Sequence, residues 1–263
     1  MLRVDLPVFA TLSLGVGPLL FARGFRDLNV RRLIQNTPTA RIRSLAMGLV
    51  EINGKVIARS QHDAPFSGRP CAYWEVDIAV RSRKNAWTIV HRSRSGSPFF
   101  VRDDTGLAFV YPEGSQCRVQ SGVEETCVGI SLPDCYARYM SDQRLALRSL
   151  WRLSVMRFRE RTLEDGQHVY VLGTAEPRSR AREVSMDDAL AATGTDGPVQ
   201  ERLRTLTEEV AAVVRRGSND RTFIISSGSE RQLTTDLALS TFGKLVAGPA
   251  LTLFGLGYWL VAR

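Results

Sequence analysis

The chain has 263 residues, of which 44% are hydrophobic and 24% charged, and 35 Lys and Arg against 27 Asp and Glu give a net charge of +8. This composition is that of a folded chain of one large or two small domains, and it excludes a collagen, a disordered chain and a disulfide-rich scaffold. The excess of positive charge is typical of proteins that contact nucleic acid or an anionic membrane surface, or that are oriented in a membrane by their charges.

An uncharged segment near the N-terminus runs from Leu6 to Ala22. As a helix it would rise about 25 Å, slightly less than the ~30 Å hydrocarbon core of a bilayer. A cleaved signal peptide is the alternative, but no small-x-small motif follows the apolar residues. We predict an N-terminal transmembrane helix over residues 1–22 and a basic juxtamembrane segment over residues 23–38.

A second uncharged segment, Leu245 to Ala262, carries Tyr258 and Trp259 near its far end, where an interfacial aromatic belt is expected. We predict a C-terminal transmembrane helix over residues 240–262. The arginines that follow the first helix place the central domain in the cytoplasm by the positive-inside rule. Five basic residues beside the two helices are candidate contacts with anionic headgroups of the lipid bilayer: Arg23, Arg26, Arg31, Arg32 and Lys244.

Between these helices, apolar and polar residues alternate in short segments, which predicts β-strands. The segments are 48–58, 71–83, 86–94, 99–112 and 152–177. Their regular spacing predicts a mainly β domain, a small OB-like barrel or sandwich with a few helices, flanked by the two transmembrane helices. Six residues are predicted to form structural turns: Asn53, Gly54, Asp104, Gly106, Gly166 and Gly173.

Two further segments have a distinct composition. Residues 178–197, rich in Arg, Ala, Asp and Gly, predict a mobile excursion. Residues 199–217 place apolar side chains at alternating spacings of four and three, which predicts an amphipathic helix that ends at Gly217. We therefore assign residues 39–233 to one β-rich domain.

The order of motifs resembles the GIDE, or BAM ("beside a membrane"), domain family, which includes a membrane-anchored mitochondrial ubiquitin ligase. The resemblance spans residues 36–262. It is carried by MGLVEINGKV (47–56), APFSGRPCAYWEVDI (64–78), Trp87, PFFVRDDTGLAFVYPEGS (98–115), FRERTLEDGQHVYVLGTA (158–175) and FIISSGSERQL (223–233).

Family members with ligase activity carry a RING after the last membrane helix, and a RING needs closely spaced Cys and His pairs for two zinc ions. Such pairs do not occur in these 263 residues. The resemblance therefore implies the fold and a role beside a membrane, most simply as a non-catalytic docking or regulatory module. The alternatives are a component of a membrane-bound RING-type ubiquitin ligase, or an unrecognised hydrolase.

One basic series is a candidate partner-binding face: Arg81, Arg83, Lys84, Arg92 and Arg94. The alternation predicts that the arginines point outward and the aromatic residues inward, which gives a solvated face that can contact lipid headgroups or an unidentified protein or peptide. Stacking of single-stranded nucleic acid on Tyr73, Trp74 and Trp87 is the disfavoured alternative.

No catalytic, metal-binding or cofactor-binding residue is predicted. Asp104-Thr105-Gly106 matches the triplet of aspartic proteases, but Arg102 and Asp103 precede it where apolar residues are expected, so a turn is the better interpretation. Four cysteines and three histidines lack zinc-site spacing and predict free thiols: Cys71, Cys117, Cys127 and Cys135, with His62, His91 and His168.

Overall fold

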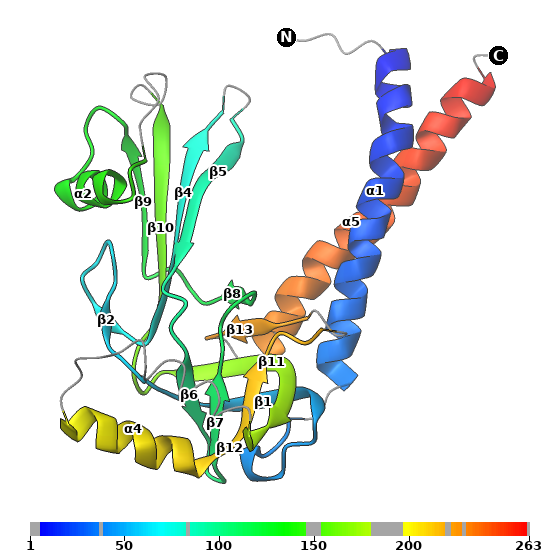
Figure 1. The fold of residues 1–263 in the computed structure, drawn as a ribbon. Helices are drawn as coiled ribbons and strands as arrows, with labels where there is room; N and C mark the ends of the chain where they lie inside the picture. Colours follow the sequence, from blue (N-terminus) through cyan, green and yellow to red (C-terminus); the bar gives the residue numbers. More distant parts are fainter. Residues whose placement is uncertain are drawn as a thin grey trace. The chain divides into compact units, whose positions relative to one another are not determined.

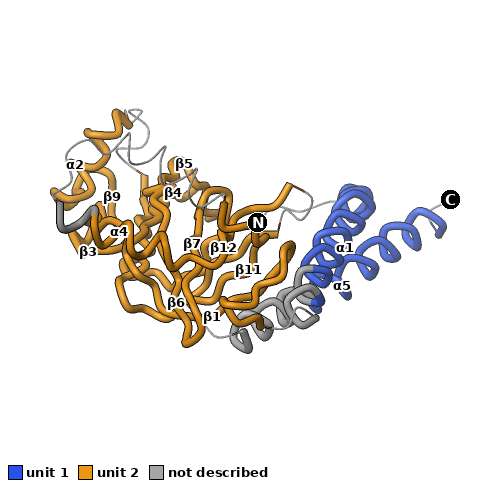
Figure 2. Tube along the Cα trace, turned by 60° about the horizontal axis from the view of Figure 1, so that its bottom comes forward, with its two compact units in different colours: residues 1–38, 229–263 blue, residues 39–228 orange. Residues whose placement is uncertain are grey.

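The computed structural model describes residues 6–36, 39–82, 85–145, 154–179, 197–218, 222–227 and 230–261, and it divides the chain into two compact units (Figure 2). Unit 1 combines residues 1–38 with residues 229–263, and unit 2 is residues 39–228. The predicted excursion, residues 178–197, falls almost entirely outside the described residues.

Unit 1 is a pair of long helices, α1 (Leu6–Asn36) and α5 (Glu230–Val261), which pack on each other (Figure 1). Each contains a stretch long and apolar enough to cross a membrane, Leu6–Asn29 and Phe242–Val261. Helix α1 does not end near Ala22 as predicted. Residues 23–36, predicted as a juxtamembrane segment, continue it as helix, because no Gly-Pro or turn sequence interrupts them.

The core of unit 2 is a closed five-stranded barrel in which β1 pairs with both β6 and β11. Around the barrel the order is β1, β6, β7, β12, β11 and back to β1. Two short strands, β8 and β13, extend the β11 side. The strands are β1 (Gly48–Ile57), β6 (Phe99–Arg102), β7 (Leu107–Val110), β8 (Gln116–Arg118), β11 (His168–Pro177), β12 (Val210–Arg215) and β13 (Ile224–Ser226).

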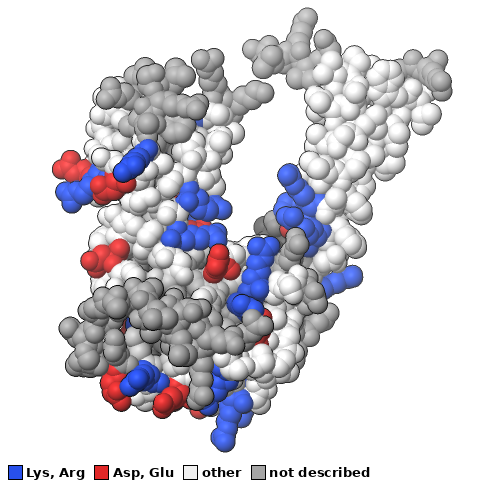
Figure 3. Space-filling view, viewed as in Figure 1, with Lys and Arg blue, Asp and Glu red and all other residues white. Residues whose placement is uncertain are grey.

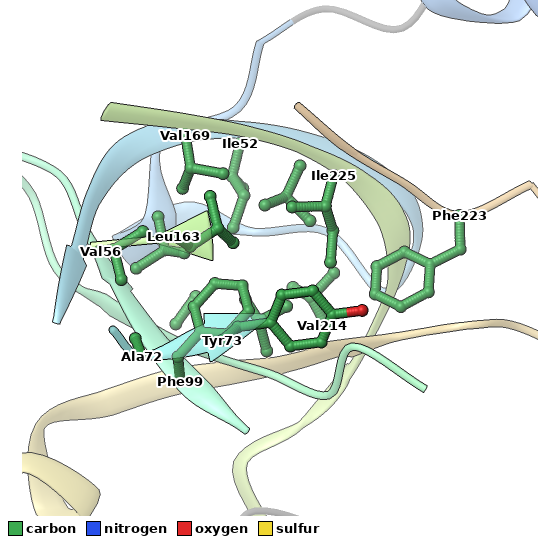
Figure 4. Close-up of a cluster of buried hydrophobic side chains, with 14 of the residues drawn as sticks. Ile52, Val56, Ala72, Tyr73, Phe99, Leu163, Val169, Val214, Phe223 and Ile225 are labelled. Carbon is green, nitrogen blue, oxygen red and sulfur yellow. The ribbon is translucent and has the colours of Figure 1, made fainter. Parts of the chain in front are cut away.

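Inward-pointing side chains fill the barrel, as expected for a barrel this small (Figure 4). Ile52, Val56, Phe99, Val169 and Val214 are all less than 2% exposed. The mainly β fold with a small barrel and a few helices, predicted from the alternation, is confirmed.

Unit 2 also contains a four-stranded antiparallel sheet, in the order β5-β4-β10-β9. Its strands are β4 (Tyr73–Arg81), β5 (Trp87–Arg94), β9 (Val123–Val128) and β10 (Val155–Leu163). Helix α2 (Asp134–Asp142) covers one side of this sheet with Tyr136, Tyr139 and Met140, which pack on Phe66 and Phe158. The other side of the sheet carries charged residues.

Smaller elements complete unit 2. They are the 3-10 turn η1 (Ile42–Ser44), the two-residue strands β2 (His62–Asp63) and β3 (Pro70–Cys71), and helix α4 (Gly197–Glu209). Helix α4 packs Leu203 and Leu206 on the barrel strands at Phe100 and Phe109. The helix predicted over 199–217 is wrong in its second half, because 210–215 form β12, paired with β7 and β11. Val210, Val213 and Val214 are β-branched and buried, so sheet pairing overrides the helical spacing.

The predicted turn at Asn53-Gly54 is also wrong, because both residues lie inside β1, paired with Tyr170 and Val169 of β11. Gly54 is needed for close approach instead: a Cβ there would lie 2.4 Å from the carbonyl oxygen of Arg102. Gly173 likewise lies within β11, where a Cβ would meet Phe223 and Val214 at 2.9 Å.

Candidate functional site

The charged side of the four-stranded sheet is the most distinctive surface of unit 2. Alternation along the strands puts arginines and carboxylates on one side of the sheet, while Val76, Ile78 and Phe158 face α2 on the other. Figure 3 shows basic and acidic side chains interspersed on the visible face of unit 2. We call the charged side of the sheet the arginine face. Its residues are Glu75, Asp77, Arg81, Arg92, Arg94, Glu124, Arg157, Arg159 and Arg161.

Two carboxylates form the centre of the arginine face. The side chains of Glu75 and Asp77 are only 4% and 5% exposed. Arg161 donates to Asp77 at 2.8 Å and lies 3.4 Å from Glu75. Arg92 donates to Asp77 at 2.5 Å, and Arg94 lies 2.9 Å from Glu75. Cross-strand register creates these contacts, because Glu75 is opposite both Arg94 and Arg161, and Asp77 is opposite Arg92.

This pairing changes the electrostatics of the groups involved. Burial raises the pKa of Asp77, but the hydrogen bonds from Arg92 and Arg161 lower it by more. The pKa of Asp77 therefore lies below its ordinary value. The hydrogen bond with Asp77 raises the pKa of the Arg92 guanidinium, against the effect of burial. Asp77 and Arg92 are therefore both charged at neutral pH.

The predicted basic face at Arg81–Arg94 is thus only partly free. Arg92 and Arg94 are paired with Asp77 and Glu75, whereas Arg81 is exposed. Arg83 and Lys84 lie outside the described residues. Sequence reasoning missed the arginines of β10, Arg157, Arg159 and Arg161; their spacing of two in VMRFRERTL was the available signal.

The β9 side of the arginine face has fewer carboxylates than arginines. Glu124, itself 44% exposed, is 2.7 Å from Arg159 and 3.9 Å from Arg157. The Arg159 hydrogen bond lowers the pKa of Glu124. The guanidinium of Arg157 also stacks over Trp87, with 4.5 Å from its carbon to the ring centre. Across the whole face, six arginines stand against three carboxylates, an excess of positive charge.

A cavity of about 680 Å³ lies on the barrel, between Asn53–Ile57 of β1, the β6–β7 turn and α4. Lys55, Arg102 and Arg202 line it together with Asp103, Asp104 and Asp165. The two signs of charge balance here, and Asp165 already accepts a hydrogen bond from the Ala58 N–H at 2.7 Å. The cavity therefore has no strong preference for either an anion or a cation.

The Asp-Thr-Gly triplet is part of a tight turn between β6 and β7. The carboxylate that organises it is Asp103, which accepts hydrogen bonds from the N–H groups of Thr105 at 2.7 Å, Gly106 at 2.8 Å and Ile42 at 2.9 Å. Asp104 is exposed, and Gly106 does not have a positive φ. Gly166, in the β10–β11 turn, does, at 77°.

His62 and Cys71 are opposite each other in the β2–β3 pair, where the Cys71 thiol donates to the His62 carbonyl oxygen at 3.3 Å. Among the described residues, no group of three or more His, Cys, Asp and Glu side chains could hold a metal ion. Burial raises the pKa of both Cys71 and Cys117 to about 11, so both are neutral thiols. His62 Nε2 lies 2.6 Å from Ser97 Oγ and 2.8 Å from Ser60 Oγ, so both hydroxyls contact the same ring nitrogen.

In unit 1, glycines bring the helix backbones together. A Cβ on Gly17 would lie 2.7 Å from the carbonyl oxygen of Gly248, and one on Gly255 would lie 2.7 Å from that of Ala10. Lys244, a predicted headgroup contact, forms an ion pair with Asp27 at 2.6 Å. The described arginines of α1, Arg23, Arg26 and Arg32, are exposed, while the side chain of Arg31 lies outside the described residues.

Together these features define a small closed β-barrel that carries an antiparallel sheet with an arginine-rich face, in a chain with two apolar helices. Residues 75–188 match the model of the GIDE family, described as an E3 ubiquitin ligase. Residues 75–188 therefore match the GIDE family, and over this range the resemblance drawn from the motifs is confirmed. The match begins at Glu75 in β4 and includes every strand of the arginine face. Searches of curated proteins and of solved structures found no match.

Proposed function

We propose that this chain is an integral membrane protein whose GIDE-family β-unit is a non-catalytic docking module beside the bilayer, on the cytoplasmic side. The observation that carries the proposal is the antiparallel pairing of α1 and α5. Gly17 meets Gly248, and Phe9 meets Phe254, so that the end of α1 and the start of α5 lie at the same end of the pair. Unit 2 lies between α1 and α5 in the sequence, so both of its chain connections to the helix pair are at that end.

The helix pair also suits a bilayer chemically. Large apolar side chains such as Leu12, Leu253 and Leu260 are more than half exposed, which is unfavourable in water and favourable in hydrocarbon. The charges of Asp27 and Lys244 neutralise each other within the two apolar stretches. The exposed Arg23, Arg26 and Arg32 lie toward the end of α1 that leads to unit 2, which favours a cytoplasmic unit 2.

Reporter fusions test this topology. One reporter is fused after Arg263 and the other is inserted within residues 178–197. We expect the two to report opposite sides of the membrane, with the insertion on the cytoplasmic side. Reporters on the same side would contradict the two-span arrangement, and a non-cytoplasmic insertion would contradict the orientation. Release of the full chain by alkaline carbonate would contradict integral attachment.

Ubiquitin transfer is the second candidate function, because the matching family is described as an E3 ubiquitin ligase. The assay is autoubiquitination of the purified full chain with a panel of conjugating enzymes, together with measurement of bound zinc. We expect neither ubiquitin chains nor stoichiometric zinc. Ubiquitin chains accompanied by zinc would replace the docking proposal with a catalytic one.

A further inference from the structure

We propose that the arginine face of unit 2 is a docking surface for the anionic phosphate headgroups of the bilayer in which the chain is anchored. The inference deepens the proposed function and rests on it, because the helices keep unit 2 close to that bilayer. This surface is distinct from the arginines of α1. Three features of the arginine face support the proposal: its excess charge, the geometry of its donors and its exposed apolar side chains.

The first feature is charge that the face does not neutralise internally. The buried carboxylates Glu75 and Asp77 are shared by Arg92, Arg94 and Arg161. Toward β9, the half-exposed Glu124 is the only carboxylate that pairs with Arg157 and Arg159 among the described residues. An anion brought to this side of the sheet would therefore complete a charge pattern that the protein leaves positive.

The second feature is that the charge is carried by arginine, held in place. The planar guanidinium binds phosphate oxygens bidentately, and a fixed one loses little side-chain entropy on binding. Stacking on Trp87 fixes Arg157, and the hydrogen bonds to Asp77 fix Arg92 and Arg161. The buried carboxylates therefore position the arginines as well as partly neutralising them.

The third feature distinguishes a lipid surface from other anions. Ile89 and Val128, at the end of the same face, are 48% and 46% exposed, and Trp87 is half-buried beside them. Register places both aliphatic residues with the arginines, because Ile89 is opposite Ala79 and Val128 is opposite Val155. Arginine beside tryptophan and aliphatic side chains is the composition of a surface that sits at the headgroup boundary. A free phosphate or an acidic peptide would leave these apolar groups in water.

The test measures thiol reactivity on the two sides of the sheet in one molecule. Thr126→Cys places a thiol on the arginine face, since Thr126 is exposed and opposite Arg157. The native Cys135 is exposed on α2, which covers the other side of the sheet, and serves as the internal control. The full chain is incorporated into nanodiscs of neutral lipid alone or with about one third anionic lipid, and labelling by a water-soluble maleimide is followed by mass spectrometry.

We expect anionic lipid at low salt to slow labelling at position 126 about tenfold while Cys135 is unaffected, and about 1 M salt to abolish the protection, because it shortens the Debye length to ~3 Å. Arg157→Gln with Arg159→Gln should remove most of the protection. Arg118→Gln with Arg138→Gln, exposed arginines outside the arginine face, removes the same charge and should leave the protection intact.

Equal labelling at position 126 in neutral and anionic discs, by a correctly incorporated chain without arginine substitutions, overturns the inference and leaves the proposed function standing. Failure of the helices to incorporate overturns both. A third arm adds soluble polyglutamate to neutral discs. Protection by polyglutamate but not by anionic lipid would assign the face to an acidic protein segment and overturn the lipid assignment.

Discussion

Asp103 shows how one side chain holds a turn. Its carboxylate accepts hydrogen bonds from three backbone N–H groups, two within the β6–β7 turn and one from Ile42 of η1. Asp103→Ala should therefore lower the unfolding free energy of unit 2 by about 2 kcal/mol, since it leaves these donors without a protein partner. Asp104→Asn, at the exposed neighbour, should change it by less than about 0.5 kcal/mol. Denaturant titration of both variants in detergent measures the difference, and equal losses would contradict this assignment.

The same carboxylate gives the turn a pH dependence. Burial raises the pKa of Asp103, but the backbone hydrogen bonds together lower it below its ordinary value. A carboxyl group with a lowered folded-state pKa stabilises the protein above its unfolded pKa of about 3.9, and this stability is lost as the pH falls through the folded value. The stability gap between wild type and Asp103→Ala should therefore narrow below about pH 4. A gap that stays constant down to pH 2 would be the contrary result.

Gly173 is a residue whose role could not be foreseen from the local sequence. It lies within β11, where Phe223 and Val214 approach to 2.9 Å of the place a Cβ would take. Gly173→Ala should destabilise unit 2 by about 1–3 kcal/mol, because these packed neighbours must move. The control is Gly122→Ala, where the nearest neighbour of the new Cβ, Thr162 Oγ1, would lie at an ordinary 3.7 Å. Thermal unfolding in detergent compares the two, and similar melting temperatures would show that the barrel absorbs the extra methyl.

At the scale of elements, the stability of the four-stranded sheet depends on the buried charges of the arginine face. Asp77 and Glu124 each contact two arginines of this face, but Asp77 is 5% exposed and Glu124 is 44% exposed. Asp77→Asn should cost about 3 kcal/mol, since it removes a buried carboxylate and leaves Glu75 as the carboxylate that Arg92 and Arg161 share. Glu124→Gln should cost less than about 1 kcal/mol. Urea unfolding of the two variants measures both losses of unfolding free energy. Equal losses would mean that burial of a carboxylate on this face does not increase its contribution to stability.

The elements that the sequence predicts well are those whose local pattern and tertiary environment agree. The hairpins β4–β5 and β6–β7 follow alternation and turn residues closely, because each is a local pairing. β12 was missed because a spacing of four and three in Val199–Val213 also fits a helix, and only pairing with β7 and β11 decides between them. The prediction of a turn at Asn53-Gly54 is wrong for the same reason, because β11 pairs with β1 continuously through these two residues.

The arginine face illustrates the same limit for the site. The spacing of two in β10 places Arg157, Arg159 and Arg161 on one side of a strand, which a sequence can show. That β9, β10, β4 and β5 are neighbours in this order depends on pairing over long sequence separations, which alternation does not encode. Glu75 and Asp77 therefore could not be recognised in advance as the partners of Arg92, Arg94 and Arg161.

At the scale of the whole molecule, the chain separates two kinds of packing. Unit 2 buries its apolar residues in a barrel and beneath helices, whereas unit 1 buries glycines and leaves large apolar side chains exposed. Water favours the first arrangement, and lipid favours the second, in which close helix contact replaces the hydrophobic effect as the source of association. A membrane-anchored docking domain requires both in one chain.

The Asp27–Lys244 pair gives a prediction about how the helices associate. Their charged atoms are 2.6 Å apart, between two apolar stretches, so either residue alone would be an uncompensated charge. Asp27→Lys or Lys244→Asp alone should weaken the association of α1 with α5, and the two together should restore it. Phe9→Cys with Phe254→Cys reports this, because the two rings pack at 5.7 Å between centroids and an oxidant should cross-link thiols placed there.

We expect each single reversal to slow cross-linking about fivefold or more, which corresponds to a loss of ~1 kcal/mol, and the double reversal to return it to the wild-type rate. Arg32→Asp is the matched control. It changes the charge of α1 by the same amount at an exposed position outside the apolar stretch, and should leave the rate unchanged. If the double reversal cross-links as slowly as the single ones, the ion pair does not hold the helices together, and the contacts of Gly17, Gly248 and Gly255 alone must account for their pairing.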